Sequence, residues 1–486
     1  MYFGGRSIDE YIAIKVNQRI KAIMGSKHSD RSKINRCKLR RERLKKRDQL
    51  ALKSAMSKAY VLDGTVSTSK SQPSTPSTTT PVTPGGSKNP FASVVAQSKP
   101  CYICKASYNK LHHFYDQLCP QCAELNWSKR HLTADLTDKV CLVTGGRVKI
   151  GFQTVLKLLR AGSFVIVTSR FPYDTALRYS KESDFSLWSH RLAIYGLDFR
   201  DIASVQTFCT FLLTSLHRLD VLINNATQTV RRPASYYGHL IDLDSSKVAD
   251  LPSEVSALVN RKTLWNQSAI CEMKPSEEDC QAVANFSSSA FKSQVPVLQE
   301  DMELDEQLLP SGHYDVNEQQ LDLRPVNSWR LKLDEVPTGE LVEVFAINTV
   351  APFIFNSKLK PLMVKTVPDL PKFIVNVSAM EGKFYRFKNP NHPHTNMAKA
   401  AINMMTRTSA QDYATDKIYM NSVDTGWIND ENPVEIAHKR MVKENFQPPL
   451  DEIDAAARIL DPVFTGLNDD QLVFGKFLKD YAETDW

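Results

Sequence analysis

The chain has 486 residues, of which 61 are Lys or Arg and 54 are Asp or Glu, so its formal net charge is +7 with neutral histidine. With 42% hydrophobic and 24% charged residues, most of the sequence has the composition of a folded protein, and its length predicts roughly two to four domains. No apolar run approaches the roughly 18 residues that a membrane span needs, and the N-terminus lacks the apolar stretch of a secretory signal.

The positive charge is concentrated near the N-terminus. Residues 31–47 contain ten basic residues and one acidic residue, a net charge of +9, and the rest of the chain therefore carries −2. Contact with nucleic acid is expected only through this segment, because the chain is not basic throughout. Residues 1–60 contain no proline and are predicted to form a basic helical region. Three interpretations of residues 31–47 stay open: a solvated helical face, a nuclear-localisation or nucleic-acid-binding patch, and a segment attracted to a membrane surface.

A Ser/Thr/Pro-rich tract follows at residues 61–100. It contains too few large apolar side chains to offset the entropy that ordering would cost. We therefore expect a disordered linker over these residues.

Two pairs of closely spaced cysteines come next, in the sequence CYICKASYNKLHHFYDQLCPQC. A CxxC turn directs two thiolates at one ion, and two such turns complete a tetrahedral site with no open position. A closed shell indicates a structural zinc ion within residues 101–130, because zinc catalysis needs an open position. His112 and His113 are alternative ligands, although packing or solvent exposure is the favoured interpretation for both. The predicted ligands are Cys101, Cys104, Cys119 and Cys122.

Short β-branched runs alternate with helical patterns from Lys139 to the C-terminus, an arrangement typical of βαβ units. Sequences such as FQTVLKLLRAG and SVQTFCTFLLTSLHRL have the spacing of amphipathic helices. We therefore expect an α/β fold, a doubly wound parallel sheet of the Rossmann type, at residues 136–486. The predicted strands are residues 140–145, 164–169, 192–198, 220–225, 372–378 and 418–424.

The alternation is interrupted once, between Asn225 and a helix predicted to begin near Thr338. The intervening segment, about residues 232–335, is far longer than an ordinary loop and is therefore an insertion. A disordered insertion is the favoured interpretation, and a lid over the substrate is the alternative. Its acidic run is expected either to fold back against residues 31–47 or to extend into solvent.

The sequence LVTGGRVKIG follows the first predicted strand of this fold and opens a helix. Glycines allow the backbone to approach a pyrophosphate, and the helix N-terminus offers free N–H groups with a partial positive charge. The second strand ends at Arg170 with no acidic residue, and an Arg there suits a 2′-phosphate, whereas an Asp or Glu would bind a ribose hydroxyl. With Arg147 and Lys149 in the turn, the sequence predicts NADP(H) rather than NAD(H).

An ordered set of motifs over residues 139–486, interrupted by the insertion, resembles the short-chain dehydrogenase/reductase family. The motifs are TGGRVKIG (144–151), Asp198 after the third strand, LINNA (222–226), Asn348 in FAINTVAPF, VNVSA (375–379), Lys399 in NMAKAA and NSVDTGWI (421–428). The chain also resembles a group of family members that carry a module with two CxxC pairs ahead of the reductase domain.

The resemblance implies roles for individual residues. Lys399 would hold the nicotinamide ribose, Asn348 would support a proton-relay water, and Ser378 would bind the carbonyl. The loop at residues 424–428 would contact the cofactor. Together with Lys149 in the turn, the expected cofactor-binding residues are Gly145, Arg147, Ile150, Gly151, Arg170, Asp198, Asn225, Lys399 and Gly426.

The chain departs from the family pattern at three positions. Lys149 stands where the turn TGxxxGxG has its second glycine, and its side chain would either narrow the approach of the backbone or reach a phosphate. Thr395 stands where the family has its catalytic tyrosine, and an alkyl hydroxyl does not ionise near neutral pH. Ala379 occupies the position of the family serine, so Ser378 serves only if the loop shifts by one residue.

Other proton donors lie close in sequence to the missing tyrosine. His392 and His394 in NPNHPHTNMAK titrate near neutrality, and Tyr385 is the nearest phenol upstream. One hypothesis is that His394 or Tyr385 supplies the acid or base. The favoured alternative is that this loop, rich in Asn, Pro and His, is simply solvated.

Together these patterns predict an NADP(H)-dependent oxidoreductase that acts on a carbonyl or alcohol of a small-molecule substrate. The alternative is a catalytically impaired NADP(H)-binding sensor or scaffold, favoured by the missing tyrosine and the displaced serine. Nine cysteines with two CxxC pairs fit a reducing compartment. We expect the cytoplasm, with the nucleus as an alternative, and a homo-oligomer stays an open interpretation.

Overall fold

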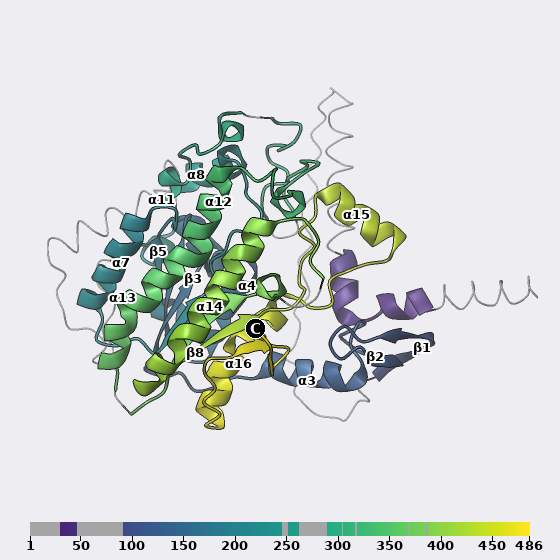
Figure 1. Ribbon diagram of the computed structural model, residues 1–486, viewed down its shortest axis with the longest axis horizontal. Helices are drawn as coiled ribbons and strands as arrows, with labels where there is room; N and C mark the ends of the chain where they lie inside the picture. Colours follow the sequence, from purple (N-terminus) through teal and green to yellow (C-terminus); the bar gives the residue numbers. More distant parts are fainter. Residues whose placement is uncertain are drawn as a thin grey trace, which may run out of the picture. The chain divides into compact units, whose positions relative to one another are not determined.

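The computed structural model describes residues 30–45, 91–244, 251–261, 289–303, 305–315, 318–367, 369–384 and 387–486. The chain forms two compact units, residues 1–126 and residues 127–486 (Figure 1).

The first unit contains a two-stranded antiparallel hairpin and the start of a helix. Its elements are β1 (Phe91–Pro100), β2 (Ser107–His112) and the first residues of α3 (Pro120–His131). The prediction of a disordered linker is therefore wrong for residues 91–100. The adjacent Val94 and Val95 interrupt the polar composition there, and Val95 is buried beneath the hairpin. Residues 61–90 lie outside the described part of the chain.

Part of the predicted basic helical region is described, and it is helical at residues 30–35 and 38–45. This segment is not a fully solvated face, because Cys37, Leu39 and Arg40 are buried. Their neighbours are residues 112–116, which follow β2, and two backbone hydrogen bonds join the two segments. Residues 1–29 and 46–60 lie outside the described part.

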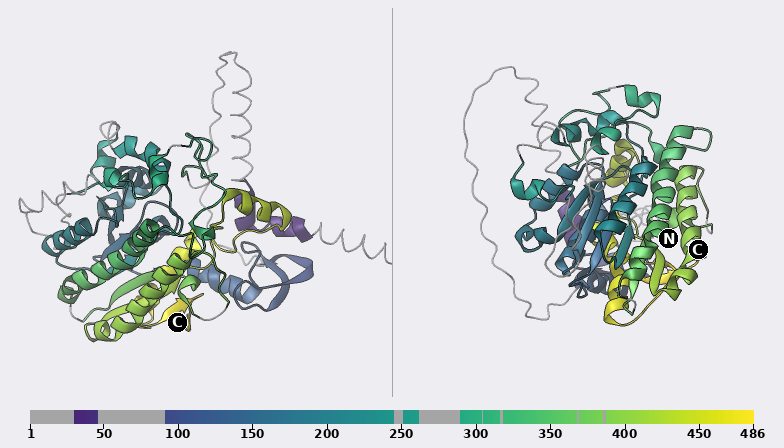
Figure 2. Two further views of the ribbon diagram at one scale, coloured as in Figure 1. Left: turned by 45° about the horizontal axis from the view of Figure 1, so that its top comes forward. Right: turned by 90° about the vertical axis from the view of Figure 1, so that its left-hand side faces the viewer.

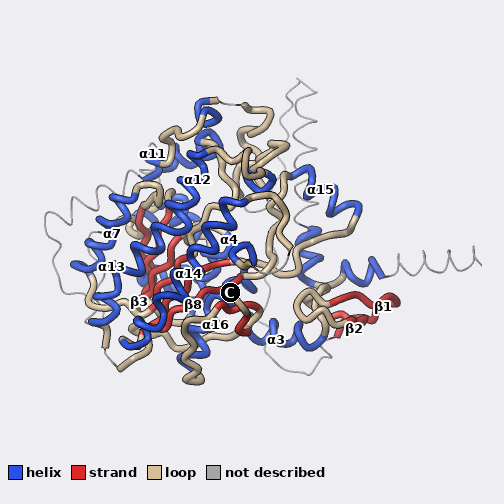
Figure 3. The backbone as a smooth tube through the Cα atoms, in the orientation of Figure 1, coloured by secondary structure: helices blue, strands red, loops and turns tan. Residues whose placement is uncertain are grey.

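The second unit is a Rossmann-like α/β fold around an eight-stranded, mostly parallel sheet (Figure 3). The strand order is β10-β9-β8-β7-β6-β3-β4-β5, and only β10 runs antiparallel to its neighbour. All six predicted strands are confirmed, whereas the short β9 and β10 carry too few residues for a clear pattern. The strands are β3 (Val140–Thr144), β4 (Phe164–Ser169), β5 (Leu192–Gly196), β6 (Val221–Asn224), β7 (Lys372–Ser378), β8 (Ile418–Asp424), β9 (Phe477–Lys479) and β10 (Ala482–Thr484).

Helices cover both faces of this sheet (Figure 2). One face packs against α7 (Ile202–Ser215), α13 (Ala351–Lys365) and α14 (Pro393–Thr415). The other face packs against α4 (Lys149–Arg160), α5 (Pro172–Ser180) and α16 (Glu452–Asn468). The remaining described helices are α6 (Phe185–Trp188), α8 (Gly238–Asp244), α9 (Ser253–Ser256), α11 (Ser289–Lys292), α12 (Thr338–Phe345) and α15 (Val434–Lys443).

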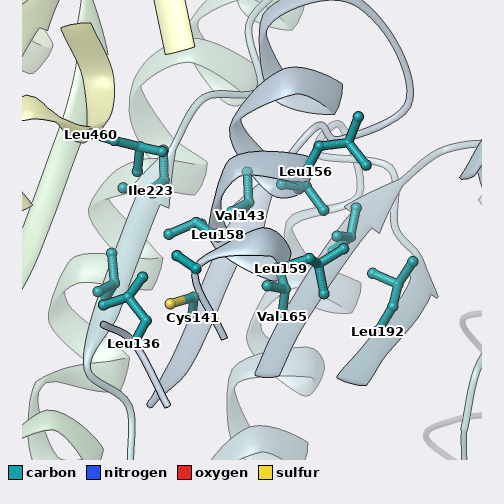
Figure 4. Close-up of a cluster of buried hydrophobic side chains, with 14 of the residues drawn as sticks. Leu136, Cys141, Val143, Leu156, Leu158, Leu159, Val165, Leu192, Ile223 and Leu460 are labelled. Atoms are coloured by element: carbon teal, nitrogen blue, oxygen red, sulfur yellow. The ribbon is translucent and has the colours of Figure 1, made fainter. Parts of the chain in front are cut away.

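Apolar side chains from the sheet and from α4 interlock on the second face (Figure 4). Val143 of β3 and Leu156, Leu158 and Leu159 of α4 are at most 1% exposed. Strands buried on both faces are almost wholly apolar, which is why their sequences are continuous β-branched runs. Helix α16 begins at a capping box in which the Asp451 carboxylate accepts hydrogen bonds from two backbone N–H groups. These local features explain why the sequence predicted the framework correctly.

One described stretch, Thr338–Lys365, is long and apolar enough to cross a membrane by length and composition alone. The sequence analysis did not find this window. Half of the window is buried inside the fold, as it is in core helices of globular proteins.

The described parts of the insertion are folded, so the expectation of a disordered insertion is wrong for them. Arg231, just before the insertion, is buried and is the centre of an ion-pair cluster. Its Nε lies 2.6 Å from Glu343 of α12, its Nη1 lies 2.6 Å from Glu300, and its Nη2 contacts Asp301. Glu300 and Asp301 of the insertion therefore pair with Arg231 within the second unit, and Asp322 pairs there with Arg324. Residues 245–250 and 262–288 lie outside the described part.

We predict that Arg231→Met lowers the free energy of unfolding by about 3–5 kcal/mol, because it leaves buried carboxylates without a cation. Urea unfolding of the full chain measures this decrease. The control is Lys439→Met, which removes an exposed pair with Glu435 and should change the free energy by about 1 kcal/mol or less. Equal effects of the two substitutions would contradict the prediction.

Candidate active site and metal centre

The carboxyl ends of β3, β4, β6, β7 and β8 lie at one edge of the sheet, because these strands are parallel neighbours. The chain order reverses at β3, which lies between β4 and β6. In open α/β sheets, ligands bind in the crevice at such a switch point. Gly145, Arg170, Asn225 and Ser378 lie at the carboxyl ends of β3, β4, β6 and β7 at this edge.

In the turn between β3 and α4, the backbone packs closely against neighbouring backbone at two glycines. Gly145 has φ +71°, and a Cβ placed there would lie 2.8 Å from the backbone of Ala226. A Cβ on Gly151 would lie 2.1 Å from the carbonyl oxygen of Gly145, so only glycine fits at the start of α4. The Asn225 side chain donates hydrogen bonds to the carbonyl oxygens of Thr144 and Gly145. The structure thus brings three predicted cofactor residues together.

Lys149 has a backbone conformation that glycine adopts more readily than other residues. Its φ is +54°, in the left-handed region that L residues rarely adopt. The neighbouring Ile150 packs against the apolar cluster under α4, and its carbonyl oxygen accepts a hydrogen bond from Thr154.

The two predicted 2′-phosphate residues already have partners within the chain. The Arg147 Nη1 lies 2.9 Å from the carboxylate of Asp174. The Arg170 guanidinium lies 4.4 Å from the ring centre of Tyr237, which belongs to the insertion. Burial raises the pKa of Tyr237, but the guanidinium groups of Arg170, Arg232 and Arg147 together lower it, and the pKa is lowered overall. The sequence analysis missed Tyr237 because nothing in the insertion's sequence relates it to β4.

Asp198 also has a partner within the chain, Arg200. Its carboxylate accepts hydrogen bonds from the backbone N–H of Arg200 at 3.0 Å and from the Arg200 Nη2 at 2.9 Å. A nucleotide contact through this carboxylate would therefore share it with Arg200.

Lys399 is buried on α14, and its Nζ donates a 2.8 Å hydrogen bond to the Val377 carbonyl oxygen at the end of β7. Burial lowers the pKa of Lys399 to about 8, and the carboxylates of Glu381 and Asp424 oppose this shift. Burial in turn raises the pKa of Glu381. The sequence analysis missed Glu381, which lies in a short 3-10 turn at Met380–Gly382.

Ser378 ends β7 and is 2% exposed, and its Oγ has no hydrogen-bond partner among the described residues. A buried hydroxyl without a partner is unusual and calls for an explanation such as a ligand or water. Asn348 lies in a π-helical turn at Ala346–Val350. Its side chain accepts from the Gln228 N–H at 2.7 Å and donates to the Gln228 carbonyl at 3.0 Å, which fixes the loop after β6.

The two histidines are buried, so the interpretation of this loop as simply solvated is wrong for them. The His392 ring stacks on Trp329 of the insertion with ring centres 3.8 Å apart. Burial lowers the pKa of His392 to about 4. The His394 Nε2 lies 3.2 Å from Glu340 of α12, and its Nδ1 has no partner among the described residues.

Thr395 faces His392, and its hydroxyl donates to the His392 carbonyl oxygen at 2.9 Å. Tyr385, the other predicted proton donor, lies outside the described residues. The loop after β8 turns at Gly426, which has φ +80°. The carboxylate of Asp424 accepts a hydrogen bond from the Gly426 N–H at 2.7 Å and pairs with Lys479 at 2.8 Å.

Two family models match this unit. The short chain dehydrogenase model matches residues 139–239, and the enoyl-(acyl carrier protein) reductase model matches residues 329–451. These matches support the short-chain dehydrogenase/reductase family. The segment between them, 240–328, corresponds to most of the insertion.

Several known proteins are similar to this chain. Uncharacterized protein R665 of Acanthamoeba polyphaga mimivirus is 28% identical over 380 residues, 75% of this chain and 71% of that protein. (+)-Neomenthol dehydrogenase of Capsicum annuum is 34% identical over 91 residues, which cover 18% of this chain and only 28% of that enzyme. Among solved structures, the Pseudomonas aeruginosa RhlG/NADP active-site complex is 15% identical, covers 71% of this chain and 95% of its own, and has a TM-score of 0.43.

The four predicted zinc ligands gather in the first unit. The Sγ atoms of the two CxxC pairs all lie within 4.8 Å of one another. The Sγ atoms of Cys104 and Cys119 are 3.6 Å apart, close to the ~3.8 Å edge of a tetrahedron with Zn–S bonds of ~2.3 Å. His112 is buried, and its Nδ1 accepts a hydrogen bond from the Phe114 N–H at 3.2 Å. Neither His112 nor His113, the alternative ligands, belongs to the cluster of metal-ligating side chains found among the described residues.

Proposed function

We propose that this chain is an NADP(H)-dependent oxidoreductase that acts on a carbonyl or alcohol of a small molecule. The observation that carries the proposal lies at the end of β7. A buried amine donates a hydrogen bond there to the backbone of the residue that precedes a buried hydroxyl, and this hydroxyl has no hydrogen-bond partner among the described residues. Lys399 reaches the backbone of Val377, and Ser378 is the next residue. A cation and a hydroxyl donor placed together at the switch point suit a ribose hydroxyl and a carbonyl oxygen.

The residues around β3 fit a dinucleotide. Gly145 and Gly151 leave room that a Cβ would fill, and Asn225 fixes the turn from the side. Arg147 and Arg170 would hold a 2′-phosphate, which favours NADP(H) over NAD(H). Ile150, Lys149, Asp198 and Gly426 complete the proposed cofactor site. When bound, NADP(H) supplies or accepts the hydride.

The chain's own residues would supply the remaining chemistry. Lys399 would hold the nicotinamide ribose, and Ser378 would donate a hydrogen bond to the substrate oxygen. Reduction of a carbonyl adds a hydride to carbon and a proton to oxygen, so a proton donor is needed. We assign this role to His394, because its Nδ1 has no described partner and Glu340 fixes its Nε2. Asn348 would hold the adjacent loop through Gln228 and support a relay water.

Two curated relatives support the reaction class over a short stretch. (+)-Neomenthol dehydrogenase of Capsicum annuum and (-)-isopiperitenone reductase of Mentha piperita are 34% and 35% identical over 91 residues. Their names describe oxidoreductases of small molecules. The matched stretch is 28% of each enzyme, so their substrates are not carried over.

A nucleotide-binding sensor or scaffold is the second candidate. Thr395 and Ala379 stand at the positions of the family's tyrosine and serine, and neither can ionise near neutral pH. In this case the cofactor site is kept and turnover is absent.

We expect NADPH to bind in calorimetry, and Lys399→Met to weaken binding by about 10- to 100-fold, as expected for the removal of a charged hydrogen bond. Thermal stability should not fall, because the substitution removes a buried ammonium. Since the pKa of Lys399 is about 8, deprotonation removes its charge as pH rises, so affinity should decline between about pH 7 and 9 in the wild type only. Exposed Lys365→Met is the control. A wild type that does not bind NADPH contradicts both candidate functions.

We expect wild-type chain to oxidise NADPH with members of a carbonyl panel, and His394→Ala to lower kcat by about 100-fold or more with an unchanged NADPH affinity. Exposed His190→Ala is the matched control. If Tyr385→Phe abolishes turnover and His394→Ala does not, the proton donor is Tyr385 instead of His394. Turnover unchanged in both variants would exclude both residues, and NADPH binding without any turnover would favour the sensor.

We also propose a structural zinc ion at Cys101, Cys104, Cys119 and Cys122. The first unit has a small apolar core, and a tetrahedral thiolate site would hold the two CxxC turns together. The four Sγ atoms converge closely enough for one ion.

The purified wild-type chain should contain about one zinc ion by atomic emission. Cys119→Ser should lower both the zinc content and the melting temperature of the first unit, because it removes one of the four ligands. Buried Cys209→Ser, in α7, is the control, and it should leave the zinc content unchanged. A metal-free chain with a fully folded first unit would refute the site.

A further inference from the structure

The first unit carries an exposed basic face that the proposed oxidoreductase does not use. Residues 30–45 contain eight basic and two acidic residues, a net charge of +6. We define the basic face as the five exposed cations of this segment. They are Arg31, Arg36, Lys38, Arg41 and Lys45.

Contacts join both helical parts of this segment to the hairpin of the first unit and to the residues that follow it. The carboxylate of Asp30 accepts hydrogen bonds from the backbone N–H groups of Ala96 at 2.8 Å and Gln97 at 3.0 Å. Arg40 pairs with Asp116 at 2.8 Å, and both side chains are at most 4% exposed. Arg40 is therefore neutralised inside the unit, and the other cations are held in a defined position.

The spacing of the exposed cations places three of them on one side of a helix. Lys38, Arg41 and Lys45 follow the i, i+3, i+7 spacing, which spans about 10 Å along the axis. Leu39 and Arg40 are buried on the other side. Among the described residues, Arg31, Arg36 and Arg41 have no acidic partner. Lys38 has one, Glu42 at 3.9 Å, and both of these side chains are half exposed.

We propose that the basic face binds the phosphate backbone of nucleic acid without reading its sequence. A nucleic-acid strand presents a charge about every 3.4 Å, so several phosphates fall within the span of one helical face. Membrane binding would need apolar side chains beside the cations, and a protein interface would need an apolar or aromatic centre. In the described part of the first unit, the exposed large apolar side chains are only Val94 and Leu125. This proposal does not depend on the oxidoreductase activity.

The test is fluorescence anisotropy of the full chain with two labelled probes, a DNA duplex of about 20 base pairs and a single-stranded RNA of about 20 nucleotides, at about 50 to 200 mM salt. The test variant carries Arg36→Gln, Arg41→Gln and Lys45→Gln. It should bind about tenfold or more weakly. Its slope of log affinity against log salt should become shallower by roughly 3 for the DNA duplex and roughly 2 for the single-stranded RNA, because each phosphate that a cation neutralises contributes about 0.9 and about 0.7 respectively. Whichever probe binds more tightly identifies the natural class of nucleic acid.

The matched control carries Lys181→Gln, Lys358→Gln and Lys365→Gln, three exposed lysines of the α/β unit. It removes the same charge and should bind like the wild type. Circular dichroism and zinc content should be unchanged in both variants, since all six side chains are exposed. A wild type that binds neither probe, a control that weakens equally, or tighter binding to polyglutamate or phosphatidylserine vesicles would each overturn the proposal.

Discussion

The ion-pair cluster around the buried Arg231 guanidinium is the interaction on which the part of the α/β unit with the proposed site depends. The guanidinium joins the loop after β6, helix α12 and the insertion, because its three nitrogens contact Glu343, Glu300 and Asp301. A buried cation is tolerated only where carboxylates surround it, so these elements are fixed together. The same helix α12 carries Glu340, and the same insertion carries Trp329. His394 lies beside Glu340 and His392 stacks on Trp329, so both histidines contact elements that Arg231 joins.

The framework of this unit was predictable because its signals are local. Each central strand is a short β-branched run, and the Gly-rich turn can be recognised from residues 144–151 alone. The segment 91–100 was mistaken for a linker because its apolar residues, among them Phe91, Val94 and Val95, are outweighed by the Ser, Thr and Pro residues of the tract as a whole. Its partner β2 lies beyond the first CxxC pair. Pairing of this kind is a tertiary effect that composition does not report.

The site was predictable only where a residue occupies a motif position. Lys399, Asn225 and Asn348 were predicted from motif positions, and their side chains donate hydrogen bonds to backbone carbonyl oxygens of Val377, of Thr144 and Gly145, and of Gln228 respectively. Glu381 and Tyr237 have no motif, and they reach the site through a 3-10 turn and through the insertion. Their contacts depend on how distant segments pack. Sequence patterns of helices and strands contain no information on that packing.

The two arginines of the proposed nucleotide site already have partners within the chain, and this affects how the site would distinguish NADP(H) from NAD(H). Arg147 forms an ion pair with Asp174, and the Arg170 guanidinium lies over the ring of Tyr237. Both cations therefore already have a partner in the absence of a phosphate. A 2′-phosphate would have to exchange with these partners or join them. A ribose hydroxyl is a far weaker acceptor than a phosphate and would leave the existing pairs in place. In the proposed site, selectivity for NADP(H) over NAD(H) would be set by the difference between these two exchanges, and Asp174 would contribute to it together with the arginines.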